Sequence, residues 1–205
     1  MDIQRVNTYQ DERFPKEILL QHGAFIVDGN QLCMFEIIDH CSAIVYFNGN
    51  INILPVIDEF RNYAEHITTF YDKNHNKICE YPRMLTKSVP LELIQPSQFF
   101  VDADKVKAVS TFLHQPEDVI IPVTYDNGLG KYLSLDGHSR MYHAFKQGWK
   151  DVNIYETTPG SYIAGFVEEA RRRGVFRISQ IMQLSHQEYI HEWYSFCDEF
   201  FARYS

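Results

Sequence analysis

Hydrophobic residues in the first 85 positions form short runs typical of strands, followed by a longer stretch with helical spacing. The runs Gly23–Gly29, Leu32–Ile38 and Ser42–Phe47 are separated by turn residues, which predicts consecutive strands. From Pro55 to Ile67, apolar residues recur at steps of three and four, which predicts a helix with one apolar face. We therefore expect residues 1–85 to form a β-meander plus a helix.

Residues 86–158 mix strand-like and helix-like patterns. An amphipathic helix is expected from Asp102, as its N-cap, to His114. A second helix is expected to follow Asp136 and to end at Gly148. Strands are expected at 119–125, 132–135 and 152–155, with a hairpin turn at 126–130 and a proline-bracketed extended segment at 89–96. This central region therefore combines strands and helices.

Residues 159–205 show only helical patterns. Pro159 can open a helix that closes at Gly174, and Ser185–Glu188 has the capping-box pattern ahead of an aromatic-rich helix. The run Arg171–Arg173 ends the first of these helices, where cations complement the helix dipole, although contact with an acidic substrate or nucleotide stays open. The chain is thus expected to be an α+β protein with regions 1–85, 86–158 and 159–205.

Charge and composition narrow the classes of function. The chain has 19 Lys and Arg against 27 Asp and Glu, a net charge of −8, and no region with a basic excess. Because phosphate contacts dominate affinity for duplex DNA, we expect no general binding to DNA, although a local anion pocket stays open. No apolar run is long enough to span a membrane and no secretory signal is visible. The four cysteines show no metal-ligand spacing, so buried or half-buried thiols and a cytoplasmic location are expected.

The most informative stretch is Lys131–Gly148, in which a strand runs through a glycine turn directly into a helix. Gly137 permits a close backbone approach, and the first amides of the helix have no intrahelical partner. Arg140 lies in the first turn and can donate two hydrogen bonds to phosphate oxygens. These features are those of a phosphate-binding turn, and a purely structural turn is the alternative.

Residues 88–156 resemble the ParB/sulfiredoxin superfamily. The resemblance rests on the run LxLDGHSRxxxAxxxG at 133–148, on Ile121-Pro122-Val123 before the hairpin, and on the proline-containing segment Leu93–Gln98. It implies a ParB/sulfiredoxin-like domain flanked by an N-terminal β-rich subdomain and C-terminal helices. Residues 1–85 resemble no family that we can name.

The variant of the motif distinguishes members of that superfamily. Sulfiredoxins carry their catalytic cysteine where this chain has His138, and ParB proteins have Gly-Glu-Arg-Arg and continue into DNA-binding regions. The pattern is most similar to the Asp-Gly-His-His-Arg of ADP- or ATP-dependent free serine kinases, from which Ser139 departs. Those kinases place a catalytic carboxylate where this chain has Gln98, with Asp102 four residues further on.

The resemblance implies a nucleotide-dependent phosphotransferase that acts on a hydroxyl-bearing metabolite, such as a hydroxy amino acid, with ATP or ADP and magnesium. The phosphates would be held by Gly137, His138, Ser139 and Arg140. Asp136 would hold magnesium or orient the acceptor, His138 would contact the transferred phosphoryl group, and Asp102 is the remaining candidate for the base. Asp136 as a simple helix cap and His138 as an exposed helical residue stay open. A nucleotide sensor or partner-binding protein without catalysis is the alternative, and a ParB-like DNA-binding protein or nuclease is the third.

Overall fold

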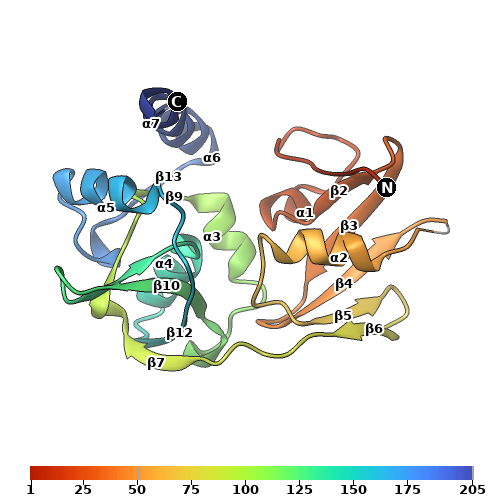
Figure 1. Ribbon diagram of the computed structural model, residues 1–205, viewed down its shortest axis with the longest axis horizontal. Coiled ribbons are helices and arrows are strands. Elements are labelled where there is room, and N and C mark those ends of the chain that lie inside the picture. The colour runs from red at the N-terminus through yellow and green to blue at the C-terminus, as the bar shows by residue number, and fades with distance from the viewer. Residues whose placement is uncertain (50, 205) are drawn as a thin grey trace. The chain divides into compact units, whose positions relative to one another are not determined.

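The computed structural model describes residues 1–49 and 51–204, and the chain divides into two compact units, Met1–Leu85 and Thr86–Ser205. Each unit has its own sheet and helices, so the protein is of the α+β class (Figure 1). Residues 159–204 belong to the second unit. Among the described residues, no helix has the length and apolarity needed to cross a membrane.

The first unit is built on a six-stranded sheet with the strands in chain order. Its strands are β1 (Ile3–Arg5), β2 (Ala24–Val27), β3 (Gln31–Ile37), β4 (Ser42–Phe47), β5 (Thr69–Asp72) and β6 (Lys77–Glu80), and its helices are α1 (Lys16–Leu20) and α2 (Leu54–Arg61). Only β4 and β5 pair in parallel, because α2 carries the chain back between them. The other neighbouring strands are antiparallel.

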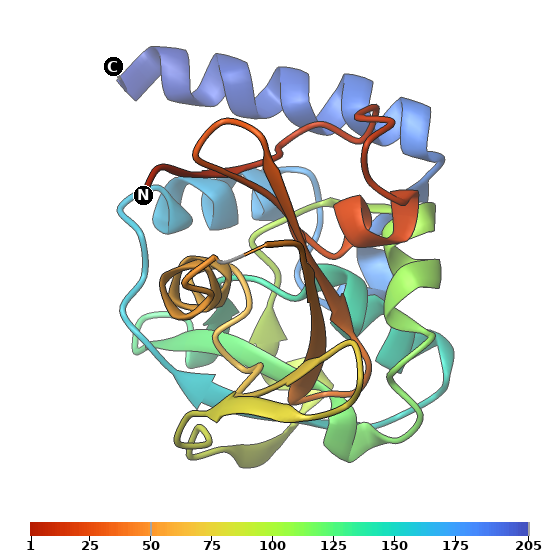
Figure 2. The ribbon, with the colours of Figure 1, turned by 90° about the vertical axis from the view of Figure 1, so that its right-hand side faces the viewer.

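The two helices of this unit cover opposite faces of its sheet (Figure 2). One face presents Phe25 and Phe35, and the ring of Phe60 in α2 stacks on Phe35 with centroids 4.3 Å apart. The other face presents Ala24, which packs with Ile18 of α1. The alternation of side chains along β2 and β3 thus supplies apolar surface to both helices.

The helix expected from Pro55 to Ile67 is shorter than its pattern indicates. It ends at Arg61, and Thr69–Asp72 forms β5. The run Ile67-Thr68-Thr69 is β-branched, which favours the strand, and Phe70 is fully buried against Phe35. The three-residue strand β1 has no signal in the sequence because it is too short to show a period.

The second unit contains a mixed sheet in the order β7-β12-β10-β11-β8 and a two-stranded parallel sheet, β13-β9. Its strands are β7 (Lys87–Pro90), β8 (Ile94–Gln95), β9 (Phe100–Asp102), β10 (Ile120–Asp126), β11 (Lys131–Ser134), β12 (Asp151–Glu156) and β13 (Met182–Leu184). Its α-helices are α3 (Ala103–Val109), α4 (His138–Lys146), α5 (Ile163–Arg172), α6 (His186–Tyr189) and α7 (Ser195–Tyr204). Single helical turns of the 3₁₀ type lie at Leu91–Leu93, Pro116–Asp118 and Ile178–Gln180, and a π-helical turn lies at Ile190–Tyr194.

Two local predictions are confirmed in this unit. The carboxylate of Asp102 accepts from the amide of Asp104, 2.8 Å away, and so caps α3. Ser185 and Glu188 form the capping box that opens α6. Both signals depend on neighbouring residues alone, which explains why the sequence predicts them.

The expectation that residues 159–205 are all helical is wrong at Met182–Leu184. This segment forms β13, which pairs in parallel with β9, about 80 residues earlier in the chain. A three-residue strand whose partner is so distant leaves no local pattern. In the aromatic-rich last helices, Tyr189 and Trp193 are core residues, and Trp193 contacts Phe99 and Phe166.

The cysteines are buried or half-buried free thiols, as expected. Cys33 and Cys41 lie in the first unit's interior, and Cys79 and Cys197 are half-buried. Burial raises the pKa of the Cys33 thiol to about 12, so this thiol stays protonated and unreactive at neutral pH.

Candidate functional site

The turn between β11 and α4 requires a glycine at position 137. Gly137 is the N-cap of α4 and has a left-handed backbone, with φ 81° and ψ 21°. A Cβ atom there would lie 2.8 Å from Cδ1 of Ile121 and 3.0 Å from Nη2 of Arg140. The first-turn amides of α4 have no partner inside the helix, and the helix dipole is positive at this end. The turn therefore has the backbone geometry of an anion-binding helix N-terminus.

Arg140 lies beneath this turn rather than on its surface. Its side chain is 8% exposed, and its Nη1 donates to the carbonyl of Ile120 in β10 over 2.6 Å. Its Nη2 lies 3.2 Å from Oδ2 of Asp136. The guanidinium, which the sequence predicts to bind phosphate oxygens, is thus hydrogen-bonded to the Ile120 carbonyl and ion-paired with Asp136. It places a positive charge under the turn and joins α4 to β10.

His138 is also buried, contrary to the exposed helical position and the phosphoryl contact considered from the sequence. The residue is 4% exposed. Its Nε2 accepts from the amide of Ser97, 3.2 Å away, and lies 2.9 Å from Oγ of Ser134. Because Nε2 is an acceptor, the proton lies on Nδ1, which is buried without a hydrogen-bond partner among the described residues. The ring therefore faces the protein interior.

Burial lowers the pKa of His138 to about 4 against an ordinary 6.5. Between pH 6.5 and 4, His138 is protonated in the unfolded chain but neutral in the native state. The native state therefore loses stability relative to the unfolded chain as the pH falls toward 4. We expect this group to reduce the free energy of unfolding by about 3 kcal/mol across that window, and to contribute no slope above pH 7.

Urea unfolding of the wild type and of His138→Gln at several pH values measures this effect. A glutamine oxygen can accept from Ser97 but does not titrate, so the stability gap between the two proteins should narrow as the pH falls. Parallel pH profiles for the two proteins would contradict the burial of a neutral His138.

Asp136 is the most exposed of the predicted site residues at this turn. Its side chain is 63% exposed and ion-paired with Arg140 on one side. Ser139, in the first turn of α4, is half-buried. Of the predicted site residues at this turn, Asp136 is therefore exposed and Ser139 partly so, while Gly137, His138 and Arg140 are buried.

The predicted base is not exposed to a substrate. The side chain of Asp102 has no exposed surface, and its Oδ2 lies 2.7 Å from Nδ1 of His186. Gln98, at the position where the similar kinases carry a carboxylate, is half-buried. Asp102 thus caps α3 and binds His186, and the structure places no second exposed carboxylate from the predicted set at the turn.

Two groups of side chains among the described residues lie close enough together to hold a cation. Asp39, His40 and Cys41 form one, in the first unit. Asp102, Asp104 and His186 form the other, with ligand atoms within 4.8 Å of one another. Asp136, the expected magnesium ligand, belongs to neither group, so magnesium at the turn would rely on this carboxylate and on the phosphates themselves.

Sequence reasoning missed the polar residues that support the turn from below. Ser97 and Ser134 both contact His138, and Gln95 is fully buried. The Gln95 amide donates to the carbonyls of Pro96 and Val175, and its Oε1 accepts from Arg171 over 3.1 Å. Arg171, part of the run expected at a helix surface, is thus half-buried and bound to the buried Gln95. These partners are up to 80 residues apart, so no local pattern marks them.

Comparisons with known proteins do not assign this chain to a family. No family model matches the chain, and no curated protein matches it. Among solved structures, half of the chain (50%) is similar to the crystal structure of protein Atu1540 from Agrobacterium tumefaciens, at 15% identity and a TM-score of 0.34. The chain spans 62% of that protein's length. A likeness of this degree defines neither fold nor function for this chain.

Proposed function

We propose that this protein has a ParB/sulfiredoxin-like domain that binds nucleotide phosphates at the N-terminus of α4 and transfers a phosphoryl group to a hydroxyl-bearing metabolite. The observation that carries the proposal is the left-handed turn at Gly137, which leads a strand into a helix N-terminus with an exposed carboxylate, Asp136, beside it. The buried guanidinium of Arg140 adds positive charge from below.

The proposed reaction is a single displacement. The acceptor hydroxyl oxygen forms a bond to the terminal phosphorus while the bond from that phosphorus to its bridging oxygen breaks. The nucleotide leaves with one phosphate fewer, and the hydroxyl proton goes to the Asp136 carboxylate. Magnesium supplied with ATP or ADP would offset charge on the phosphates. The contribution of the protein is positioning and charge stabilisation, which dominate catalysis of this reaction class.

A nucleotide sensor without turnover is the second candidate. It is favoured by the inward-facing His138, by the buried Asp102 and by Gln98 in place of a carboxylate. These three positions leave Asp136 as the one predicted acid or base that is exposed at the turn. The two candidates share the same phosphate site and differ in turnover.

A thermal-shift screen of ATP, ADP, CTP and GTP, with and without magnesium, tests the shared site. A nucleotide present at about 100 times its Kd should stabilise the protein by about 2.7 kcal/mol. Gly137→Ala should lose most of this shift. Gly148→Ala is the matched control, because it places a side chain on a left-handed glycine at the other end of the same helix and meets no atom within 4 Å. A flat response to all four nucleotides in the wild type would refute both candidates.

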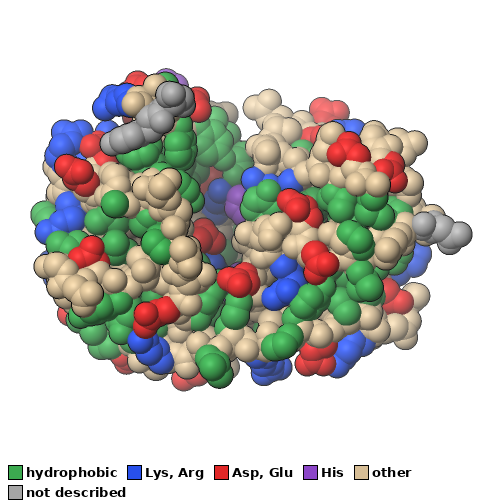
Figure 3. Space-filling view, in the orientation of Figure 1, with side chains coloured by type: hydrophobic (Ala, Val, Ile, Leu, Met, Phe, Trp, Pro, Cys, Tyr) green, Lys and Arg blue, Asp and Glu red, His purple; other side chains and the backbone are tan. Residues whose placement is uncertain are grey.

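Acidic and basic side chains are interspersed over the face of the molecule drawn in Figure 3. Duplex DNA is bound by clustered cations that neutralise several phosphates together. The absence of sequence-specific duplex binding, inferred from the net charge of −8, therefore stays our prediction.

A further inference from the structure

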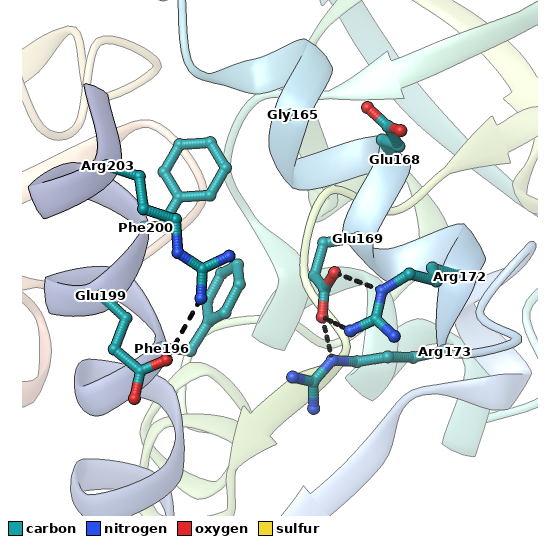
Figure 4. A pocket seen from close by; sticks show the side chains of 9 residues that line it. All are labelled: Gly165, Glu168, Glu169, Arg172, Arg173, Phe196, Glu199, Phe200 and Arg203. Carbon is teal, nitrogen blue, oxygen red and sulfur yellow. Dashed lines mark hydrogen bonds and ion pairs between the residues drawn. The ribbon is translucent and has the colours of Figure 1, made fainter.

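A cavity of about 360 Å³ lies between α5 and α7 in the second unit (Figure 4). One side is formed by Arg172 and Arg173 at the end of α5, and the other by Arg203 and the rings of Phe196 and Phe200 in α7. Its size is in the lower part of the range of small-molecule sites. It shares no lining residue with the turn at Gly137.

The helices approach each other closely at one point beside this cavity. The ring of Phe200 packs on the backbone of Gly165, where a Cβ would lie 2.6 Å from the ring. Phe166, which follows Gly165 in α5, contacts Phe196 and Phe200 of α7. The aromatic surface of α7 is thereby packed against α5 and forms an apolar wall of the cavity.

The charged residues of the lining are three arginines and three glutamates, and at the end of α5 two of the arginines bind the same carboxylate, Glu169. Glu169 accepts from Nε and Nη2 of Arg172 over 2.8 and 2.7 Å and from Nε of Arg173 over 2.6 Å. These hydrogen bonds hold the pKa of Glu169 at about 2, so the carboxylate stays ionised. One negative charge is thus shared by two guanidinium groups.

Arg173 is positioned to bind a further acceptor. Its guanidinium lies over the ring of Phe99, 4.2 Å from the centroid, and is fixed through Nε by Glu169. Among the described residues, no acceptor is bonded to its two terminal nitrogens. In Figure 4 these nitrogens extend toward α7. A guanidinium held in this way presents the paired donors that match a carboxylate.

We propose that this cavity binds a small organic carboxylate with an apolar body. The carboxylate accepts from the two terminal nitrogens of Arg173, and the apolar body packs on Phe196 and Phe200. Arg203 faces the same space from α7 and adds a second cation. The lining also contains three glutamates, which disfavours polyphosphates and separates this site from the proposed nucleotide site.

The test is protein-observed NMR titration of the whole chain with three probes that share a phenyl group. These are 3-phenylpropionate, which has only the carboxylate, phenylalanine, which adds an ammonium group, and phenethylamine, which lacks the carboxylate. We expect 3-phenylpropionate to cause saturable shifts concentrated on 165–173 and 196–203, and phenethylamine to cause none there. Tighter binding of phenylalanine than of 3-phenylpropionate would identify amino acids as the ligand class.

Variants locate the contact. Arg173→Gln should weaken binding of 3-phenylpropionate by roughly tenfold or more, the scale of charge-assisted hydrogen bonds. Arg177→Gln, which removes the same charge from an exposed arginine outside the lining, should leave the affinity for 3-phenylpropionate unchanged. Because Arg173 also packs on Phe99, Arg203→Gln serves as a second variant: its side chain is 75% exposed and pairs loosely with Glu199, so folding should persist while affinity falls about threefold.

Three results would overturn the proposal. They are the absence of saturable shifts with both carboxylates, an affinity for phenethylamine equal to that for 3-phenylpropionate, and an affinity for 3-phenylpropionate that both variants leave unchanged. None of these results depends on nucleotide binding, so the proposal and the phosphotransferase assignment can fail separately.

Discussion

Asp136→Asn should reduce phosphoryl transfer about 100-fold or more while nucleotide binding persists or tightens, the scale of losing one positioned catalytic group. The substitution keeps the shape of the side chain and an oxygen that can cap the helix, but removes the charge. A carboxylate that is 63% exposed beside the proposed phosphate site would repel the phosphates unless a cation or the acceptor lies against it. Removing the charge therefore relieves repulsion in the ground state and removes the proton acceptor in the reaction.

The measurement is transfer from ATP or ADP to a panel of hydroxy amino acids, with affinity for the nucleotide measured on the same samples. Asp151→Asn is the matched control, because it neutralises an exposed carboxylate at the start of β12 and should leave transfer unchanged. If Asp136→Asn transfers phosphate as fast as the wild type, Asp136 is not the proton acceptor of the reaction. Tight nucleotide binding with no transfer by the wild type would favour the sensor.

Arg140→Ala should lower the free energy of unfolding by about 2–3 kcal/mol. From the sequence, an arginine in the first helical turn is expected to contribute little to folding. In the structure, its side chain is 8% exposed and donates to the carbonyl of Ile120 over 2.6 Å. The substitution leaves that carbonyl without this donor and leaves a void beneath Gly137, where the guanidinium now packs.

Urea unfolding compares Arg140→Ala with Arg177→Ala, which removes an exposed arginine of the same unit and should cost less than about 0.5 kcal/mol. The nucleotide affinity of folded Arg140→Ala should also fall, since a positive charge beneath the turn is lost. Equal stability of Arg140→Ala and the wild type would show that the guanidinium does not support the turn.

The sequence by itself determined the elements whose signals are local. The caps at Asp102 and Ser185 depend on residues within three positions along the chain. The sequence also predicts the strand, the glycine turn and the helix around Gly137, because a left-handed N-cap favours glycine and this glycine closely follows an apolar run. These local rules gave the α+β class and the place of the candidate site.

Only the tertiary structure decided which side chains of that site are exposed. His138 faces inward because Ser97, 41 residues away, meets its Nε2, and Arg140 is buried because the carbonyl of Ile120 in β10 lies within reach. The pairing of β13 with β9 and the cavity beside Arg173 likewise depend on segments distant in the chain. A periodic pattern in the sequence shows which residues share a face of one helix or strand. It does not show which distant segments pack on that face, so these contacts can be seen only in the tertiary structure.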